Sequence, residues 1–210
     1  MDILDSKSIQ WLSSIIIDNF QLEKPAYSDQ SEVFKIISLN ANYYLKIGSS
    51  LETERSNTIK LGPFIAVPEV VAFKNIDKRD HLLLTEVAGK NLCEFINEWT
   101  PAYITKKFAQ TVKEFHSLDP YKLFLNARPN SILLHGDMSL PNVIFTQDGL
   151  SGIIDLGHLS TGSADLDITD ALWSLQRNLG SGYGELFLEE YGGVEITPRI
   201  DEALRFIYTP

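Results

Sequence analysis

The first half of the chain is a series of short apolar runs that are rich in β-branched and aromatic residues. Such runs predict strands, because branched and aromatic side chains pack well on a pleated sheet. The expected strands cover residues 33–37, 41–47, 68–73 and 81–86. Helical spacing of apolar positions predicts one helix at 9–20, before these strands, and a short one at 52–61, among them.

From Asn91 onward the apolar positions take the spacing of helices. Thr100-Pro101 predicts a helix start, because threonine caps a helix and proline is tolerated in its first turn. This helix is expected to end before Asp119-Pro120, and a second helix follows later in the chain. The two apolar stripes are Ile104, Phe108, Val112, Phe115 and Leu118, and then Ile168, Ala171, Leu172 and Leu175. A strand-rich part followed by a helical part predicts an α+β fold.

A partly polar segment, His135-Gly136-Asp137-Met138-Ser139-Leu140-Pro141-Asn142, interrupts the apolar pattern of the second half. Short apolar runs lead into it and out of it. Gln147-Asp148-Gly149 then signals a hairpin turn, and Ile153-Ile154-Asp155-Leu156-Gly157 closes the returning strand. The pattern therefore puts Asp137 and Asn142 in one loop and Asp155 at the end of the next hairpin.

This arrangement is typical of phosphoryl-transfer enzymes, which mainly position an acceptor and neutralise charge on phosphate oxygens. Asp137 would take or orient the proton of the acceptor hydroxyl. Asn142 offers a neutral oxygen to a hard cation, and Asp155 offers a carboxylate, so Mg²⁺ is the expected metal. The alternative is structural: a local turn at Gly136-Asp137 and an unrelated helix cap at Asp155.

The pattern His-Gly-Asp-x-x-x-x-Asn followed by Ile-Asp resembles the signature of the aminoglycoside phosphotransferase and choline kinase group, which is related to the protein kinases. Within that group the chain is most similar to the aminoglycoside 3′-phosphotransferases, over most of its length. The resemblance implies a bilobal kinase-like α+β fold, with a nucleotide-binding N-lobe at 1–87 and a catalytic, acceptor-binding C-lobe at 88–210. It also implies transfer of the γ-phosphoryl group of ATP, or alternatively GTP, with Mg²⁺, to a hydroxyl of a small acceptor such as an aminoglycoside.

Further nucleotide-binding roles follow from the same resemblance. Lys46, within Tyr43-Tyr44-Leu45-Lys46, matches the strand lysine that holds the α- and β-phosphates, and Tyr44 matches the aromatic residue that stacks on adenine. Glu54 matches the helix glutamate that pairs with this lysine, with Glu52 as a rival. A structural interpretation remains for each: Lys46 can extend to the surface, and Tyr44 can be a core residue.

Two other segments resemble parts of the nucleotide site. The stretch 28–34 is similar to the loop over the phosphates, with Ser31 best placed to contact them, although it lacks the Gly-x-Gly-x-x-Gly pattern and also fits an ordinary turn. Residues 83–89 resemble the hinge that binds adenine through its backbone. There the carbonyl of Thr85 and the N–H of Val87 take the expected roles.

Four further polar residues have both structural and chemical interpretations. His135 is expected to brace its loop by hydrogen bonding rather than to bind metal, and His116 to be a core or helix C-terminal residue. Asp165 and Asp167 are candidates for the metal site. Capping and bracing roles at the following helix are preferred for both, with Asp167 the better candidate to brace the loop.

Composition adds a hint about the acceptor and the compartment. The formal charge of −10 disfavours a nucleic-acid partner and favours a neutral or cationic acceptor, unless the acidic surface serves solubility alone. Cys93 is the only cysteine, which suits a reducing compartment. No signal peptide or membrane-spanning stretch is evident, so a cytoplasmic protein without a membrane partner is expected.

Three departures from the family weaken the aminoglycoside assignment. The segment 119–134 is too short for the helical insertion that carries acidic acceptor-binding residues in the family, and the sequence ends at Pro210 without the acidic C-terminal tail. His158 stands where an arginine is expected. A kinase of another small alcohol, an amino alcohol or a sugar, is therefore an alternative, as is a nucleotide-binding pseudokinase. A binding module that uses no phosphate would leave Lys46, Asp137 and Asp155 unexplained.

Overall fold

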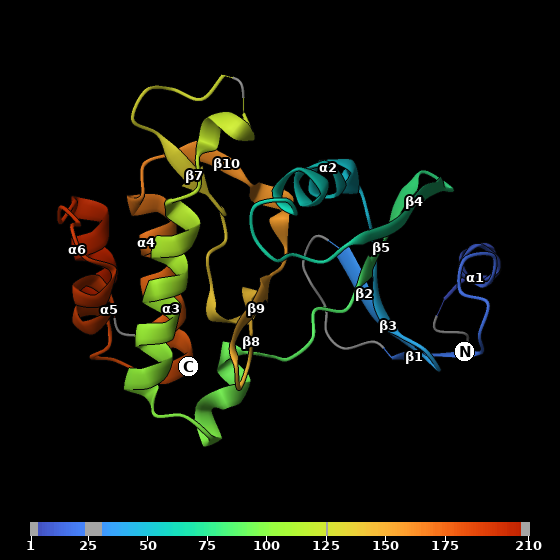
Figure 1. Cartoon of the computed structure of the whole chain (residues 1–210), viewed down its shortest axis with the longest axis horizontal. Helices are drawn as coiled ribbons and strands as arrows, with labels where there is room; N and C mark the ends of the chain where they lie inside the picture. The colour runs from blue at the N-terminus through green and yellow to red at the C-terminus, as the bar shows by residue number, and fades with distance from the viewer. Residues whose placement is uncertain (1–3, 24–30, 125, 207–210) are drawn as a thin grey trace. The chain divides into compact units, whose positions relative to one another are not determined.

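The computed structural model describes residues 4–23, 31–124 and 126–206, and the chain divides into two compact units (Figure 1). The N-unit comprises 1–63 and 67–87, and the C-unit comprises 64–66 and 88–210. Within the described residues, no helix is long and apolar enough to cross a membrane.

The N-unit is an antiparallel sheet of five strands in the order β1-β2-β3-β5-β4, accompanied by two helices. The strands β2, β3, β4 and β5 and the helix α2 confirm the elements expected from the sequence, with ends shifted by a few residues. Their bounds are α1 (Ser6–Ser13), β1 (Phe20–Glu23), β2 (Ser31–Ser38), β3 (Asn42–Gly48), α2 (Leu51–Leu61), β4 (Val70–Ile76) and β5 (Arg79–Thr85).

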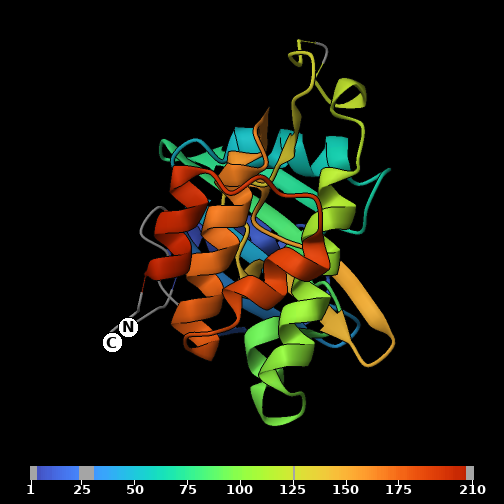
Figure 2. The same cartoon turned by 90° about the vertical axis from the view of Figure 1, so that its left-hand side faces the viewer.

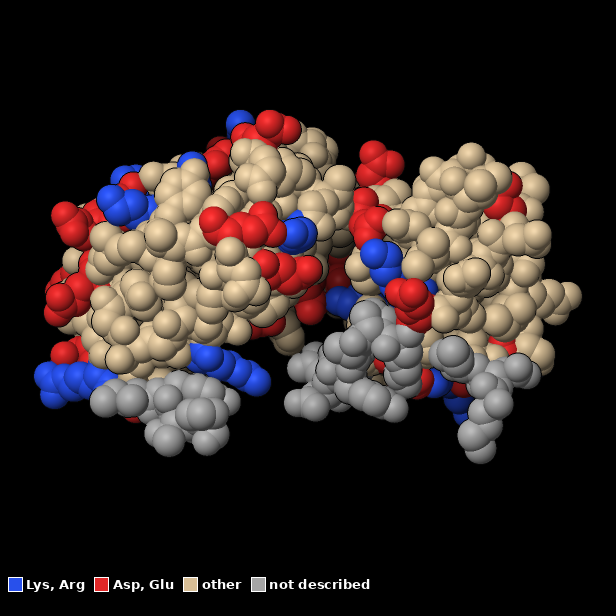
Figure 3. All heavy atoms as spheres, turned by 90° about the horizontal axis from the view of Figure 1, so that it is seen from below, with Lys and Arg blue, Asp and Glu red and all other residues tan. Residues whose placement is uncertain are grey.

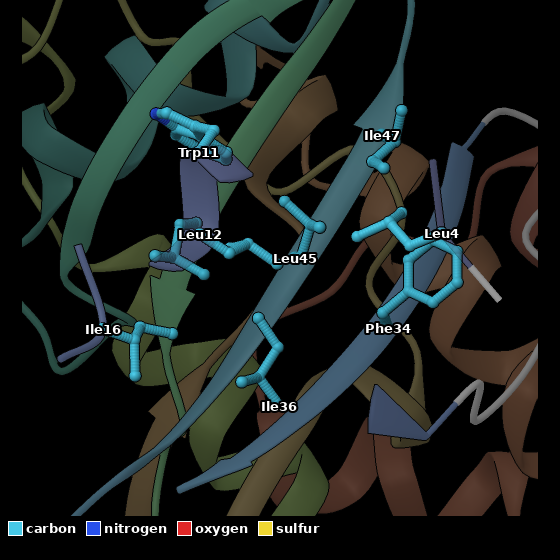
Figure 4. Close-up of a cluster of buried hydrophobic side chains, with 9 residues drawn as sticks. Leu4, Trp11, Leu12, Ile16, Phe34, Ile36, Leu45 and Ile47 are labelled. Atoms are coloured by element: carbon cyan, nitrogen blue, oxygen red, sulfur yellow. The ribbon is translucent and has the colours of Figure 1, made fainter. Parts of the chain in front are cut away.

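The two faces of this sheet have different packing. One face forms a buried apolar cluster with α1, in which side chains of the helix and of the central strands meet (Figure 4). The opposite face packs a smaller group, Leu51, Leu82 and Leu84, beside α2. Strand residues two apart share a face, so Tyr44 and Lys46 lie on the α2 side of the sheet, opposite Leu45.

The first helix is shorter than its apolar spacing predicts. α1 ends at Ser13, and Phe20 begins the edge strand β1, so the predicted helix over 9–20 is wrong in its second half. At the helix end, Ser14 Oγ donates to the carbonyl oxygen of Trp11 at 2.6 Å, a local bond that competes with the helical pattern. Ile16 lies beyond the helix but is still buried in the cluster, which explains the misleading periodicity.

The C-unit combines helices with two small sheets, whose strand orders are β6-β8-β9 and β10-β7. In Figure 2, where its helices face the viewer, α3 packs against α5 and α4 packs against α6. The bounds are β6 (Lys90–Asn91), η1 (Leu92–Asn97), α3 (Pro101–His116), η2 (Pro120–Lys122), β7 (Ile132–Leu134), η3 (Leu140–Asn142), β8 (Val143–Thr146), β9 (Gly149–Ile153), η4 (Leu156–His158), β10 (Ser160–Gly162), α4 (Asp165–Leu179), α5 (Gly184–Tyr191) and α6 (Pro198–Arg205).

The helices α3 and α4 confirm the two stripes predicted from the sequence. Thr100 caps α3 by accepting a hydrogen bond from the Tyr103 N–H, and Pro101 occupies its first turn. The stripe residues Ile104, Phe108, Val112, Phe115, Ile168, Ala171, Leu172 and Leu175 are all fully buried. Leu118 lies beyond the end of α3. The hairpin β8–β9 is also confirmed, with Asp155 two residues after its second strand.

Candidate active site

The loop of residues 135–142 begins directly after β7 and turns on Gly136. This glycine has a φ of 81°, in the region that favours glycine. A Cβ at this position would lie 2.5 Å from the backbone oxygen of His158, so a side chain does not fit without moving the main chain. The turn therefore fixes the start of the 135–142 loop.

Gly136→Ala combines a backbone clash with an unfavourable φ. An unfavourable φ alone costs about 1–3 kcal/mol, so the free energy of unfolding is expected to fall by more than this amount. Gly180→Ala is the matched control. Gly180 has a φ of 88°, but a Cβ there would meet nothing within 4 Å. Urea denaturation of both variants isolates the clash. Equal losses of stability would show that the 135–142 loop yields to the added methyl group.

Asp137 and Asn142 are joined within the 135–142 loop. Asn142 Nδ2 donates to the backbone oxygen of Asp137 at 2.9 Å and to its Oδ2 at 3.0 Å. Asn142 is 8% exposed, whereas Asp137 is exposed. Because the amide nitrogen uses both hydrogens on Asp137, the amide oxygen is the atom that remains to bind a cation. The same contact orients the carboxylate of Asp137.

Asp155 follows the hairpin in a left-handed conformation, with φ 64° and ψ 61°. It precedes the 3₁₀ helix η4, but its side chain makes no capping hydrogen bond there. The structure thus removes the alternative in which Asp155 is only a helix cap. A carboxylate on such a backbone conformation is often part of a functional site.

Asp155 is tied to the 135–142 loop through its neighbour Ile154. The Ile154 N–H donates to the backbone oxygen of Asn142 at 3.0 Å. The Ile154 oxygen in turn accepts from His135 Nε2 at 2.9 Å. These two contacts fix the position of Asp155 relative to Asn142.

His135 is a bracing residue, as the sequence indicated. A carbonyl oxygen only accepts, so the Nε2 atom that contacts Ile154 carries the hydrogen, and Nδ1 accepts from the Asp137 N–H at 3.3 Å. The imidazole is fully buried and packs against Phe115, with 6.0 Å between ring centroids. Both ring nitrogens are thus used in holding the 135–142 loop.

Asp167 braces the start of the 135–142 loop from α4, in agreement with the sequence analysis. Its carboxylate accepts from the His135 N–H at 2.7 Å and the Gly136 N–H at 2.9 Å. Burial alone would raise the pKa of Asp167, but the hydrogen bond from His116 and these two backbone bonds hold the pKa below its ordinary value. Asp165, by contrast, makes no capping bond; Ala164 is the N-cap residue, so the predicted capping role of Asp165 is wrong.

The structure adds two supports that the sequence did not reveal. His116 Nε2 lies 3.1 Å from Asp167 Oδ2, and its Nδ1 lies 2.8 Å from the hydroxyl of Tyr191 on α5. The hydroxyl of Ser174 accepts from the Leu140 N–H at 2.9 Å. Asp167 and Ser174 are seven residues apart, so one face of α4 holds both ends of the 135–142 loop.

The N-unit contains a buried ion pair where the resemblance indicated one. Lys46 Nζ donates to Glu54 Oε1 at 2.7 Å, and the side chains are only 11% and 5% exposed. The rival Glu52 is exposed and pairs with Arg55 at 2.6 Å instead. Lys46 therefore does not extend into solvent. A buried pair of this kind holds the ammonium group in a fixed place, although it contributes little net stability.

The other nucleotide-site candidates fall on β2, β3 and the end of β5. Tyr44 is half-buried on the same face as Lys46, with Lys35 Nζ 5.8 Å from the centroid of its ring. Thr85 ends β5, and in the described part of the chain the Val87 N–H donates no hydrogen bond. Ser31 begins β2, whereas residues 28–30 of the expected phosphate loop lie outside the described residues.

The donor atoms near Asn142 and Asp155 suit Mg²⁺. Among the described residues, no three His, Cys, Asp or Glu side chains gather around one point as ligands. Mg²⁺ does not require such a group, because it keeps several waters and takes one or two carboxylates together with phosphate oxygens. One amide oxygen and one carboxylate, tied together through Ile154, fit this coordination.

Comparison with known proteins supports the resemblance to a family of phosphotransferases. Residues 121–205, which include the 135–142 loop and Asp155, match the phosphotransferase enzyme family. An aminoglycoside 3′-phosphotransferase of Enterococcus faecalis is 27% identical over 77% of this chain and 83% of its own length. One of Niallia circulans is 36% identical over 44% of this chain and 35% of its own length.

Solved structures of aminoglycoside phosphotransferases have the same fold. The enzyme APH(3″)-Id from Streptomyces rimosus superposes with a TM-score of 0.73 at 18% identity, over 96% of this chain and 97% of that one. An aminoglycoside 3′-phosphotransferase of type VIII gives 0.72 at 16% identity, over 95% and 96%. The predicted resemblance, the kinase-like α+β fold and the class of phosphotransferase acting on an alcohol group are confirmed.

Proposed function

We propose that this phosphotransferase moves the γ-phosphoryl group of a nucleoside triphosphate to a hydroxyl of an aminoglycoside. The observation that carries the proposal is the fixed set of Asp137, Asn142 and Asp155, in a chain whose relatives are named aminoglycoside 3′-phosphotransferases. Solved relatives support the choice of ligands. One is described as a ternary complex with streptomycin and ATP, and another as a complex with ADP and streptomycin.

Asp137 is the residue that handles the acceptor. Its Oδ2 is held by Asn142, which leaves Oδ1 of an exposed carboxylate for the acceptor hydroxyl. As the hydroxyl oxygen bonds to the γ-phosphorus, its proton passes to Asp137. The bond from that phosphorus to the β–γ bridging oxygen breaks, and a nucleoside diphosphate leaves.

Lys46 and its neighbours bind the nucleotide. The ammonium of Lys46, fixed by Glu54, neutralises the α- and β-phosphates, and Ser31 makes a further phosphate contact. Tyr44 stacks on adenine, while the Thr85 carbonyl and the Val87 N–H bind its edge. ATP is the expected donor, with GTP as the alternative.

Asn142 and Asp155 would hold the Mg²⁺ ion that accompanies the nucleotide phosphates. Bound there, Mg²⁺ supplies positive charge to the phosphate oxygens. The contacts of His135 and Ile154 keep the amide oxygen of Asn142 and the carboxylate of Asp155 in fixed positions relative to each other.

The charge distribution favours a cationic acceptor. Residues 88–210 contain 16 acidic and 9 basic side chains. Acidic side chains appear over the face of the molecule shown in Figure 3. A neutral sugar would gain nothing from this field, whereas a polyamine-like acceptor is attracted by it. The runners-up remain a kinase of another small alcohol and a pseudokinase without acceptor turnover.

An acceptor panel tests the proposal. Release of nucleoside diphosphate is measured with ATP and with GTP, in the presence of aminoglycosides, choline, neutral sugars or amino alcohols. Aminoglycosides are expected to raise turnover above the rate with water alone. Faster release of nucleoside diphosphate with another alcohol alone would identify a different acceptor. An unchanged rate with every compound would favour the pseudokinase.

Salt should weaken the use of a cationic acceptor. If acidic side chains attract the aminoglycoside, kcat/KM is expected to fall steeply as salt rises, because charges about 10 Å apart are largely screened near 0.1 M ionic strength. A neutral sugar, if accepted, serves as the control and should show a much flatter dependence. Turnover of an aminoglycoside that is insensitive to salt would contradict electrostatic attraction.

A further inference from the structure

We propose that Asp170 on α4 binds an ammonium group of the acceptor beside the hydroxyl that Asp137 orients, and so selects aminated acceptors. The inference rests on the proposed function, since it names the residue that recognises the acceptor at that site. Neither the sequence motifs nor the contacts that hold the 135–142 loop assign any role to Asp170.

The position of Asp170 on the helix carries the first step. Asp167 and Ser174 both hold the 135–142 loop, through His135 and Gly136 at one end and Leu140 at the other. Asp170 comes three residues after Asp167 and four before Ser174, so it lies on nearly the same side of α4 as both of them. Its carboxylate therefore projects beside the middle of the loop, where Asp137 lies.

The lack of a partner is the second step. No hydrogen bond or ion pair of Asp170 is found among the described residues, although the residue is half-buried. Arg199 of α6 is near enough to act on it electrostatically but forms no ion pair with it there. A carboxylate in such surroundings is costly unless something cationic approaches it.

The electrostatics agree with this geometry. Burial, with the nearby carboxylates of Asp167 and Asp137, raises the pKa of Asp170 to about 6, and Arg199 only partly opposes the rise. Near neutral pH the group is still mostly ionised. An ammonium ion placed between Asp170 and Asp137 would reduce the repulsion between the two carboxylates. Binding of such an ion is therefore favourable.

The neighbouring surface suits a sugar ring. On the helix, 100° per residue puts Asp170 between the side that holds the 135–142 loop and the exposed side that carries Leu166 and Trp173. Those two are 38% and 45% exposed, and the centroid of the Trp173 ring lies 6.2 Å from that of Phe206, just after α6. Apolar ring faces beside a carboxylate match a molecule with both sugar rings and amino groups.

The test compares Asp170→Asn with wild-type protein in two measurements. Calorimetry gives the affinity for an aminoglycoside and for an analogue in which one amino group is replaced by a hydroxyl. The assay of nucleoside diphosphate release gives KM and kcat for the same two compounds. The variant should lose about 10-fold or more in affinity for the aminated member, as expected for one charge-assisted hydrogen bond. The change should appear in KM more than in kcat, and Asp170→Glu should restore part of it.

Asp148→Asn is the matched control, because it removes the same charge from an exposed turn of the C-unit. It should leave affinity and turnover unchanged. Equal affinities of wild type and Asp170→Asn for every aminated acceptor would overturn the role of Asp170. Selective binding without turnover would instead leave this role standing and refute the proposed kinase activity, so the two failures are distinguishable.

Thermal stability separates a binding role from a structural one. The raised pKa of Asp170 means that wild-type stability falls as pH rises through the interval from about 4 to about 6, where the folded protein must release a proton that it holds more tightly than the unfolded chain. Asp170→Asn should therefore have a higher Tm than wild type at pH 7.5, and the difference should shrink towards pH 4. A lower Tm at pH 7.5 would mean that Asp170 serves to hold α6 through Arg199.

Discussion

Asp137→Ala is expected to lower kcat for the acceptor by about 10²–10⁴-fold, the range typical of a positioned general base. Nucleotide affinity should stay nearly unchanged, because the proposed partner of Asp137 is the acceptor and not the nucleotide, and the main-chain oxygen of residue 137 still accepts from Asn142. Single-turnover phosphorylation and nucleotide titration measure the two effects separately. Turnover equal to that of wild type would exclude Asp137 from the reaction.

Asp148→Ala is a suitable control for that experiment. Asp148 is exposed in the turn between β8 and β9, at least six positions along the chain from each of the proposed functional residues. It should keep both kcat and nucleotide affinity. If Asp148→Ala lowered kcat as much as Asp137→Ala does, the cause would be a general effect of charge on the C-unit.

The second large effect concerns the metal. Asp155→Ala should abolish the part of nucleotide binding that depends on Mg²⁺ and should reduce turnover severely, whereas Asn142→Ala should weaken binding less. The reason is that a carboxylate contributes a full charge to the cation and an amide only a dipole. Titration of Mg²⁺ against nucleotide affinity compares the three proteins.

Three identical Mg²⁺ titrations would rule out this site. Asn142→Ala also removes the hydrogen bond to Asp137, so its kcat should fall more than its metal affinity. Asn142→Asp provides a further comparison, because it keeps an oxygen for the cation but replaces the donor to Asp137 with a like charge. It should retain metal binding and lose turnover.

The C-unit half of the site was predictable because its main contacts are local. Asp137 and Asn142 are five residues apart in one loop, and a two-strand hairpin brings Asp155 next to them. Motif spacing contains that information directly. The bracing role of Asp167 was preferred from its place at the start of the following helix, and the structure shows its bonds to the 135–142 loop.

Longer-range supports were not visible in the sequence. The bond between His116 and Asp167 joins residues 51 positions apart, and the one between His116 and Tyr191 spans 75. Such pairs depend on how α3, α4 and α5 pack, and periodicity does not specify that packing. His116 was therefore interpreted only as a core or helix-end residue.

The error at the first helix has a similar origin. Ile16 continues the apolar spacing of α1, so the sequence predicts a longer helix than the one observed. In the structure Ile16 belongs to an irregular segment, and its side chain still reaches the buried cluster. Packing into a core requires an apolar side chain but not a helical backbone. The sequence analysis assigned no role to Asp170, because a single polar residue beside the apolar stripe of a helix resembles an ordinary solvent-facing position.

The measurement that tests the central claim most directly is mass spectrometry of an aminoglycoside incubated with the protein, Mg²⁺ and either ATP or GTP. The account predicts that the drug gains one phosphoryl group with wild-type protein, and that Asp137→Ala gives almost none in the same time. An unmodified drug with wild-type protein, under conditions where the nucleotide binds, would contradict it.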